Sequence, residues 1–447
     1  MKAGYGHNTH TLQSIIHDVG DGWQRYSLLV SPMLETDYFS WIACGCQTKC
    51  VLLQTVQSQK NMTKIKVDNF GPIRSVDVRL GDLTILIGPQ ASGKSLFLEL
   101  FKLVMDRACI VETLRKYNYI LSKTDANPIL DYYFGEGLHG LFTNDTKIEF
   151  SNRVFSVEDL LKPSKNRQAV KESVFYIPAQ RILGIADGRP KNFMEFDGSA
   201  PFVLKNFSET LRVFVQSGLG NPDVIFPMRN RLKGAVKKSI DESVFHGAKV
   251  IIDQSSGQRK MKLSVNSVSL PFMTWSAGQK EFMPLLLAMY CLSGPPTSVI
   301  NKDDYKWVVI EEPEMGLHPR AIQTVILEMV ELMQAGYKVI VSTHSPTLLE
   351  FAWVFESLKN LPADDFKNAL CELFDIGKNG TAAKVLNGLE EKTLKTYYFS
   401  SEGDGVFSTD ISSLDVGDEN LNVAEWGGLS AFSGKASDVV GKYYQES

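Results

Sequence analysis

An eight-residue loop rich in glycine constrains the fold of this chain more than any other feature. It follows a run of apolar residues at 83–87 and precedes residues 96–104, which are apolar on most helical faces. These flanks predict a buried strand before the loop and a helix after it. The loop has the spacing G-x4-G-K-[ST] and consists of Gly88, Pro89, Gln90, Ala91, Ser92, Gly93, Lys94 and Ser95.

A strand, a glycine loop and a helix in this order form a site for phosphate groups. The glycines let backbone N–H groups turn toward the phosphates, and the positive end of the helix adds attraction. By this interpretation Lys94 neutralises the β- and γ-phosphates of ATP, and Ser95 binds Mg²⁺. A loop that has this spacing by chance is the alternative, which the flanking strand and helix disfavour.

A second apolar strand, expected at 307–310, runs directly into two acidic residues. A magnesium nucleotide needs a carboxylate at the end of a neighbouring strand and a residue that activates the attacking water. We expect Glu311 to lie on the Mg²⁺ side, in a place that aspartate usually takes, and Glu312 to act as general base. A helix N-terminus enriched in acids is the alternative, since Glu314 also precedes the helix expected at 320–334. The phosphate loop favours the catalytic interpretation.

Strands and helices alternate in two separate parts of the sequence. Residues 62–80 predict a hairpin that leads into the strand at 83–87, and a strand at 337–341 follows the helix at 320–334. Such alternation implies a parallel sheet covered by helices, with the hairpin as an antiparallel edge. We therefore expect an α/β fold.

About 200 residues separate the two parts, more than a minimal nucleotide-binding core uses. We expect them to form an inserted lobe at about 182–268, within a head that occupies 62–350. The expected elements of the lobe are helices at 201–217 and 230–245 and a hairpin at 250–268. Sustained heptads do not occur there, which disfavours a coiled-coil arm. Residues 351–447 are expected to complete the head or to bind a partner.

Residues 1–61 differ from the rest of the chain, because they show no sustained helical or strand period. Either the native product begins at Met62, where the well-patterned sequence starts, or the extension is genuine; both interpretations remain open. A metal site formed by Cys44, Cys46 and Cys50 with the nearby histidines, His7, His10 and His17, is a weaker alternative, because the spacing C-x-C-x3-C lacks the paired knuckles of a zinc site.

Composition excludes several classes of protein. Lysine plus arginine number 47 against 51 aspartate plus glutamate, a net charge of −4, so no overall basic field attracts nucleic acid. Six cysteines form no disulfide framework, and no apolar run approaches the roughly 20 residues of a membrane-spanning helix. We expect a cytoplasmic protein without a membrane partner. Two interpretations of a local basic stretch remain open, a surface that binds nucleic acid and a solvated helix face. The acidic residues that follow the stretch favour the solvated helix face. The basic residues are Arg229, Arg231, Lys233, Lys237 and Lys238.

A third motif, added to the phosphate loop and the acidic strand, makes the sequence similar to the ABC-type ATPases. Residues 275–281, Trp-Ser-Ala-Gly-Gln-Lys-Glu, resemble the signature motif of that superfamily and stand about 30 residues before the acidic strand. The resemblance implies that Ser276 and Gly278 reach the γ-phosphate held by an opposite subunit, and it counts Gln279 among the nucleotide-binding residues. It also implies a P-loop NTPase fold of ABC type, a mixed sheet with flanking helices and an inserted α-rich lobe.

Other positions of the sequence correspond to motifs of the ABC-type ATPases, but these correspondences are less specific. His344 follows the last apolar strand and corresponds to the switch histidine that contacts the γ-phosphate, although by itself it is better explained by a capped helix start. Gln180, after the strand expected at 174–177, is a weaker candidate for contact with the metal and the attacking water. His318 lies in the place of the D-loop, where transport ATPases usually carry aspartate, and Ala277 replaces a usual glycine.

The acidic turn indicates which branch of the superfamily is most similar. Residues 311–319, Glu-Glu-Pro-Glu-Met-Gly-Leu-His-Pro, with Ser-Thr-His-Ser at 342–345, resemble the ATPase part of overcoming-lysogenization-defect (OLD) nucleases and the RecF- and SMC-like ATPases. Many such proteins work in bacterial anti-phage defence or DNA repair. The OLD branch carries a C-terminal Toprim domain, for which the residues after Glu350 show no counterpart. The resemblance therefore implies a separate effector chain, a nuclease or a toxin, and nucleic acid as a further partner.

Two other functions remain open. The inserted lobe, His318 and the long tail disfavour the nucleotide-binding subunit of a membrane transporter. The set of Lys94, Glu311, Glu312 and His344 disfavours a scaffold that binds ATP with little turnover. We expect an ATP-hydrolysing switch that forms a homodimer or a higher homo-oligomer and closes on ATP.

Overall fold

The computed structural model describes residues 14–18, 23–27, 63–122, 125–161, 170–220, 223–255, 257–380, 383–403 and 405–444. The chain divides into two compact units, Met1–Lys60 and Asn61–Ser447. In the first unit, β1 (Ser14–Asp18) and β2 (Trp23–Ser27) form an antiparallel hairpin. The cysteines weighed as metal ligands and the methionine weighed as a start lie outside the described residues: Cys44, Cys46, Cys50 and Met62.

The second unit is built on a ten-stranded sheet in the order β7-β6-β3-β4-β18-β17-β5-β16-β15-β8. The strands are, in that order, Arg153–Phe155, Phe142–Phe150, Thr63–Phe70, Ile73–Leu80, Gly405–Asp410, Leu394–Glu402, Leu83–Ile87, Lys338–Ser342, Trp307–Glu311 and Val174–Ile177. From β17 to β8 all neighbours run parallel, whereas β7, β6, β3 and β4 form an antiparallel edge. The mixed α/β fold predicted from the sequence is confirmed.

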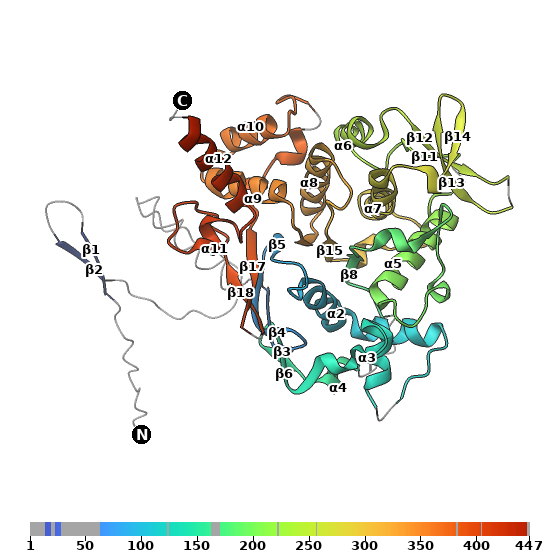
Figure 1. Ribbon diagram of the computed structural model, residues 1–447, viewed down its shortest axis with the longest axis horizontal. Coiled ribbons are helices and arrows are strands. Elements are labelled where there is room, and N and C mark those ends of the chain that lie inside the picture. Colours follow the sequence, from blue (N-terminus) through green and yellow to red (C-terminus); the bar gives the residue numbers. More distant parts are fainter. Residues whose placement is uncertain are drawn as a thin grey trace, which may run out of the picture. The chain divides into compact units, whose positions relative to one another are not determined.

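Helices cover both faces of the parallel strands because these strands are apolar on both sides. In β5, Leu83, Ile85 and Ile87 belong to one hydrophobic core, and Leu86 belongs to the other. In Figure 1, α2 and α3 lie below the parallel strands, and α7 and α8 lie above them. The helices of the two layers are α2 (Lys94–Lys116), α3 (Asn127–Phe134), α4 (Val157–Leu161), α7 (Ala277–Ser293), α8 (Pro319–Gln334) and α9 (Pro346–Leu358).

The region expected as an inserted lobe combines helices with a two-stranded sheet, β10-β9, and a four-stranded sheet, β11-β12-β13-β14. Its helices are α5 (Phe202–Val213) and α6 (Gly234–Ile240), and both continue as a π-helical turn, Phe214–Gly218 and Asp241–Phe245. Its strands are β9 (Ile185–Ala186), β10 (Arg189–Pro190), β11 (Val224–Phe226), β12 (Lys249–Asp253), β13 (Lys260–Val265) and β14 (Val268–Pro271). The start predicted at residue 230 was four residues early, because Asn230 has a positive φ of 59° and Lys233 is extended.

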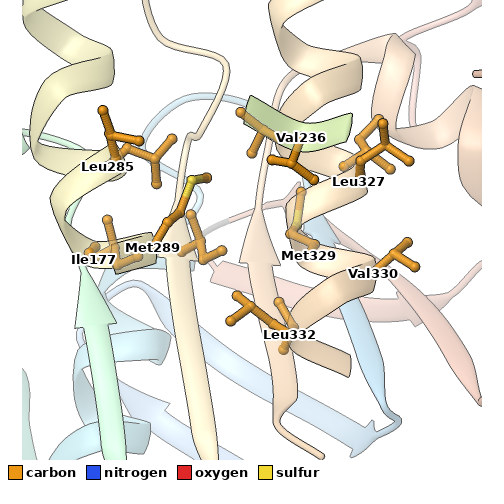
Figure 2. Packing of buried hydrophobic residues seen from close by; sticks show 14 of the residues in the cluster. Ile177, Val236, Leu285, Met289, Leu327, Met329, Val330 and Leu332 are labelled. Carbon is orange, nitrogen blue, oxygen red and sulfur yellow. The ribbon is translucent and has the colours of Figure 1, made fainter. Parts of the chain in front are cut away.

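The lobe shares its hydrophobic core with the helices above the sheet. Figure 2 shows Val236 of α6 beside Leu327 and Met329 of α8, and Leu285 of α7 near Ile177 of β8. All five side chains are buried in the same cluster. The lobe is therefore held to the head by apolar packing that extends from α6 to the sheet.

The C-terminal part of the chain enters the middle of the sheet. β17 lies between β5 and β18, and β18 in turn pairs with β4. The helices of this part are α10 (Ala363–Leu373), α11 (Leu421–Ala424) and α12 (Ala431–Tyr444). Among the described helices of the whole chain, none combines the length and the apolar character that crossing a bilayer requires.

A buried charge network joins α2 to the start of β8. The Lys102 ammonium lies 3.2 Å from Asp106 and 2.6 Å from Glu172, and it donates to the carbonyl of Val174 at 2.8 Å. Although burial favours the neutral amine, the two carboxylates raise the pKa of Lys102 above its ordinary value. Asp106 also accepts a hydrogen bond from the Ser173 amide at 2.8 Å. The cluster therefore bonds the backbone at the start of β8 as well as the side chains of α2.

We expect Lys102→Met to lower the free energy of unfolding by about 3–5 kcal/mol, because it leaves buried carboxylates without their cation. Urea denaturation measures the loss. Lys64 forms an ion pair with Asp77 on the surface, with 38% and 45% of the two side chains exposed. The control Lys64→Met should therefore cost less than about 1 kcal/mol. Equal losses in the two variants would contradict a stabilising role for the buried network.

Two carboxylates lie on the buried side of α8. Glu328 is fully buried and accepts from the Ser293 hydroxyl at 2.8 Å, while its second oxygen has no hydrogen-bond partner. Glu331 lies one turn further along, 3.5 Å from the Lys233 ammonium. Burial, with a contribution from the charge of Glu331, raises the pKa of Glu328 from 4.5 to about 8.

The raised pKa of Glu328 makes stability depend on pH. Between the ordinary pKa of 4.5 and the folded-state pKa of about 8, the unfolded chain binds fewer protons than the folded chain, so stability falls as pH rises. Glu328→Gln keeps a group that can accept from Ser293 and removes the titration. We expect this variant to be more stable than the wild type at pH 8 by about 1–3 kcal/mol. Urea unfolding at several pH values tests this, with the exposed Glu242→Gln as control; parallel pH profiles would refute it.

Candidate functional site

Neighbouring parallel strands end together at one edge of the sheet. The register pairs Glu311 with Ser342 and Ser342 with Leu86, so β15, β16 and β5 finish side by side. Beyond this line lie Glu312, the segment that carries His344, and the phosphate loop, which leads into α2 (Figure 1). Ligands of open parallel sheets bind at this carboxyl edge. The phosphate loop, the acidic turn and the segment of His344 are therefore brought together.

The conformation of the phosphate loop requires its small residues. Gly93 has a φ of 73° and Ala91 a φ of 60°, both in the left-handed region. A Cβ atom on Gly88 would lie 2.5 Å from the backbone oxygen of Phe399, in β17. The loop is thus supported from beneath by a strand of the C-terminal part.

The Lys94 side chain folds back over the loop. Its ammonium donates to the carbonyl oxygens of Gly88 and Pro89, each at 2.8 Å, and to the Ser92 hydroxyl at 3.1 Å. Only 6% of Lys94 is exposed, and this burial lowers its pKa to about 8. The charges of three nearby carboxylates, Glu312, Glu314 and Glu311, oppose the decrease.

Glu311 is the last residue of β15 and is 4% exposed. One carboxylate oxygen accepts from the Ala179 amide at 3.2 Å, whereas the other is buried without a hydrogen-bond partner. Burial raises the pKa of Glu311, and the hydroxyl of Ser95 is the largest influence that opposes it. A buried carboxylate oxygen with a free lone pair near a serine hydroxyl fits the oxygen ligands that Mg²⁺ prefers.

Glu312 has a strained backbone. Its φ is 40°, a value that residues other than glycine rarely adopt. Its amide donates to the carbonyl of Ser342 at 2.9 Å. One carboxylate oxygen lies 3.6 Å from Nε2 of His344. About a third of each side chain is exposed, so both can meet a ligand at the edge of the sheet.

Glu314 fixes the segment that carries His344. One of its carboxylate oxygens accepts from the Thr343 hydroxyl at 2.9 Å and from the His344 amide at 2.5 Å. No feature of the sequence distinguishes this residue from the other acids of the turn. Its role is to hold the backbone of His344 against the acidic turn.

Ser276 and Gly278 lie at the start of α7. Ser276 is exposed and caps the helix, because its hydroxyl accepts from the Gln279 amide at 3.2 Å while the Gln279 side chain accepts from the Ser276 amide at 3.2 Å. The Gln279 side chain also donates to the carbonyl of Val244 at 3.2 Å. A Cβ atom on Gly278 would lie 2.8 Å from the oxygen of Gly316, so the helix start packs closely on the turn after β15.

Two neighbouring residues of the loop after β8 lie near the site, and one is exposed whereas the other is buried. Gln180 is exposed, and the residue before it, Ala179, bonds Glu311. Arg181 is fully buried and donates to backbone carbonyls of the acidic turn. Sequence reasoning missed Arg181, because a single arginine after a short strand carries no spacing that distinguishes it from a surface residue.

His318 and two residues of the basic stretch form hydrogen bonds or ion pairs within the fold. Nδ1 of His318 accepts from the Arg320 amide at 3.3 Å and so caps α8. In the basic stretch, Arg231 is half-buried and donates to the Pro295 carbonyl at 3.2 Å, and Lys233 pairs with Glu331. Among the described residues, no group of three or more His, Cys, Asp or Glu side chains forms a metal cluster.

Part of the sequence matches a known family. Residues 220–350 match the family described as "AAA domain, putative AbiEii toxin, Type IV TA system". The matched segment includes the start of α7, the acidic turn and His344. It covers less than half of the chain.

One curated relative and two solved structures are similar to the chain. The Old nuclease of Escherichia phage P2 is 35% identical over 72 residues, which is 16% of this chain and 12% of the nuclease. The SMC head domain from Thermotoga maritima has a TM-score of 0.33 at 10% identity, over 78% of this chain and 98% of that domain. A dimeric bacterial ABC transporter cassette has a TM-score of 0.29 at 11% identity, over 64% of this chain and 90% of the cassette.

The family match contains the acidic turn and His344 but begins after the phosphate loop at residues 88–95. The Old nuclease match spans only a small part of that protein, and the family match supplies the wider segment. The resemblance predicted from the motifs is confirmed: this chain is similar to the ABC-type AAA ATPases, and the match to the family described as an AAA domain extends over residues 220–350.

Proposed function

We propose that this chain hydrolyses ATP and that the ATP-bound state closes two copies of it face to face. One observation carries the proposal. The Lys94 ammonium, the unpartnered oxygen of Glu311 and the Glu312–His344 pair all lie where β5, β15 and β16 end together. A cation, a metal-binding oxygen and a candidate base in one place are the groups that phosphoryl transfer to water requires.

The phosphate loop and two oxygen ligands account for nucleotide binding. Lys94 and the loop amides would bind the β- and γ-phosphates, with Lys94 exchanging its carbonyl partners for phosphate oxygens. Ser95 and Glu311 would hold Mg²⁺, and Gln180 is exposed beside them as a further ligand. When bound, Mg²⁺ supplies positive charge that offsets the negative charge of the phosphates.

Glu312 is the base in the proposed reaction. Its carboxylate would accept a proton from a water molecule while the water oxygen attacks the γ-phosphorus and the bond to the β–γ bridging oxygen breaks. ADP and phosphate are the products. His344, 3.6 Å from the carboxylate, would orient it and donate to the γ-phosphate.

The exposed start of α7 supports the dimeric part of the proposal. Ser276 and Gly278 would complete the ATP site of a second copy, where the positive end of a 17-residue helix attracts phosphate. The Gln279 side chain is engaged in the helix cap and in a bond to Val244, so its contribution would be to shape the helix start.

For the biological role, we propose anti-phage defence or DNA repair with a separate effector, a nuclease or a toxin. The support is the similarity of a 72-residue segment to the Old nuclease of a phage and the toxin named in the family description. Nucleic acid is the trigger that this role implies. A transporter subunit and a scaffold with little turnover are the competing functions.

We expect Glu312→Gln to reduce ATP turnover by roughly 10²- to 10⁴-fold and to accumulate an ATP-bound dimer, because it removes the base and leaves the phosphate loop intact. Light scattering with size-exclusion chromatography measures the mass with and without Mg-ATP, and with double-stranded DNA added. The double variant Glu312→Gln/Lys94→Ala is the control, which should stay unchanged by ATP. Unchanged turnover would refute the role of Glu312, and an unchanged mass would favour the scaffold.

The pKa of Lys94 predicts how ATP affinity depends on pH. A bound phosphate stabilises the ammonium, so binding above pH 8 takes up a proton from solution, and affinity falls as pH rises through the pKa of about 8. The loss should approach about tenfold per pH unit at high pH. Titration calorimetry in two buffers of different ionisation enthalpy measures the proton uptake. Binding at pH 9 without proton uptake would show that Lys94 does not contact the phosphates.

A further inference from the structure

Arg181 connects three segments of the site through its guanidinium group. It donates to the carbonyls of Glu311 and Glu312, each at 3.2 Å, and to that of Pro313 at 3.5 Å. Its Nε donates to the carbonyl of Glu281, in the first turns of α7, at 3.1 Å. Arg181 itself follows β8, so one side chain joins the loop after β8, the acidic turn and the helix that begins at Ser276.

Two of these bonds act on the backbone of Glu312, together with the bonds from its amide to Ser342 and from the Met315 amide to its carbonyl. The carbonyl of Glu311 belongs to the peptide group before Glu312, and the carbonyl of Glu312 belongs to the peptide group after it. Fixing the orientation of both groups fixes φ and ψ of the residue between them. Glu312 has a φ of 40°, a strained value that persists only where the surroundings impose it.

We infer that Arg181 is a positioning residue, which holds Glu312 in its strained conformation and ties it to the start of α7. The inference rests on the proposed ATPase function, because it acts through the proposed base. It also gives a physical connection between the residue that activates water and the helix proposed to reach the ATP of a second copy.

Burial makes this arrangement selective for arginine. The residue is fully buried, and its guanidinium group donates to four backbone carbonyls from two segments of the chain. Arginine has five N–H donors in a planar fork, whereas lysine has three donors on one atom at the end of a flexible chain. A lysine would keep the charge but could not reach Glu281 and the acidic turn with the same geometry.

The environment supplies negative charge for the buried guanidinium. Among the carboxylates, Glu281 has the largest electrostatic effect on Arg181, and one of its carboxylate oxygens is buried without a hydrogen-bond partner. The other carboxylates that act on Arg181 are those of Glu314, Glu312 and Glu311. Burial lowers the pKa of Arg181, and the carboxylates that it positions offset part of this effect.

The test compares Arg181→Lys with the wild type. We expect kcat for ATP to fall by roughly 10- to 100-fold, because the base is displaced, while the Kd for ATP stays unchanged, because the phosphate loop is untouched. Arg181→Gln, neutral but with an N–H donor, is measured in parallel in case one variant does not fold. Arg189 forms two bonds to Glu195, at 3.1 and 3.2 Å, on the exposed side of the lobe, so Arg189→Lys is the matched control and should keep the wild-type kcat.

A double-mutant cycle separates positioning from general damage. If Arg181 acts through Glu312, adding Arg181→Lys to Glu312→Gln should cause no further loss of turnover. Additive losses, a wild-type kcat in Arg181→Lys, or a loss of ATP binding in step with kcat would overturn the inference. A wild-type chain that binds and hydrolyses no ATP would instead overturn the proposed function, and the inference with it.

Discussion

The in-register ending of the parallel strands is the constraint on which the rest of the site depends. Glu311, Ser342 and Leu86 lie on one line across three strands. A shift of one residue in β15 would turn Glu311 to the opposite face of the sheet. The apolar residues that alternate between the two cores fix this register, so packing in the interior determines the chemistry at the edge.

Charged residues are buried in this protein where they connect elements. Lys102 joins α2 to β8, and Arg181 joins the acidic turn to α7. Each of these two side chains bonds backbone carbonyls, and Lys102 also bonds carboxylates. A side chain that cannot reach the same acceptors could not replace either of them. One of these buried cations bonds the first residue of β8, and the other lies four residues beyond the last residue of this strand.

The sequence predicted the elements that carry strong local signals. The strands at 83–87, 174–177, 307–310 and 337–341 and the phosphate loop lie where apolar runs and glycine spacing placed them. Arg181 and β17 were not predicted, because their importance comes from residues more than a hundred positions away in the chain. The cap formed by Gln279 was also missed, since a glutamine three residues after a serine fits both a helix cap and a nucleotide-binding motif.

The strand β17 has a consequence for how the protein is made. The phosphate loop at residue 88 rests on the backbone of Phe399, about 300 residues later in the chain. During synthesis on the ribosome the loop and its helix emerge long before this support exists, and contacts of such separation form slowly. A nascent chain therefore reaches its working geometry only after residue 399 has been synthesised. Until then, the flank of β5 that later pairs with β17 is a surface to which chaperones bind or other strands pair.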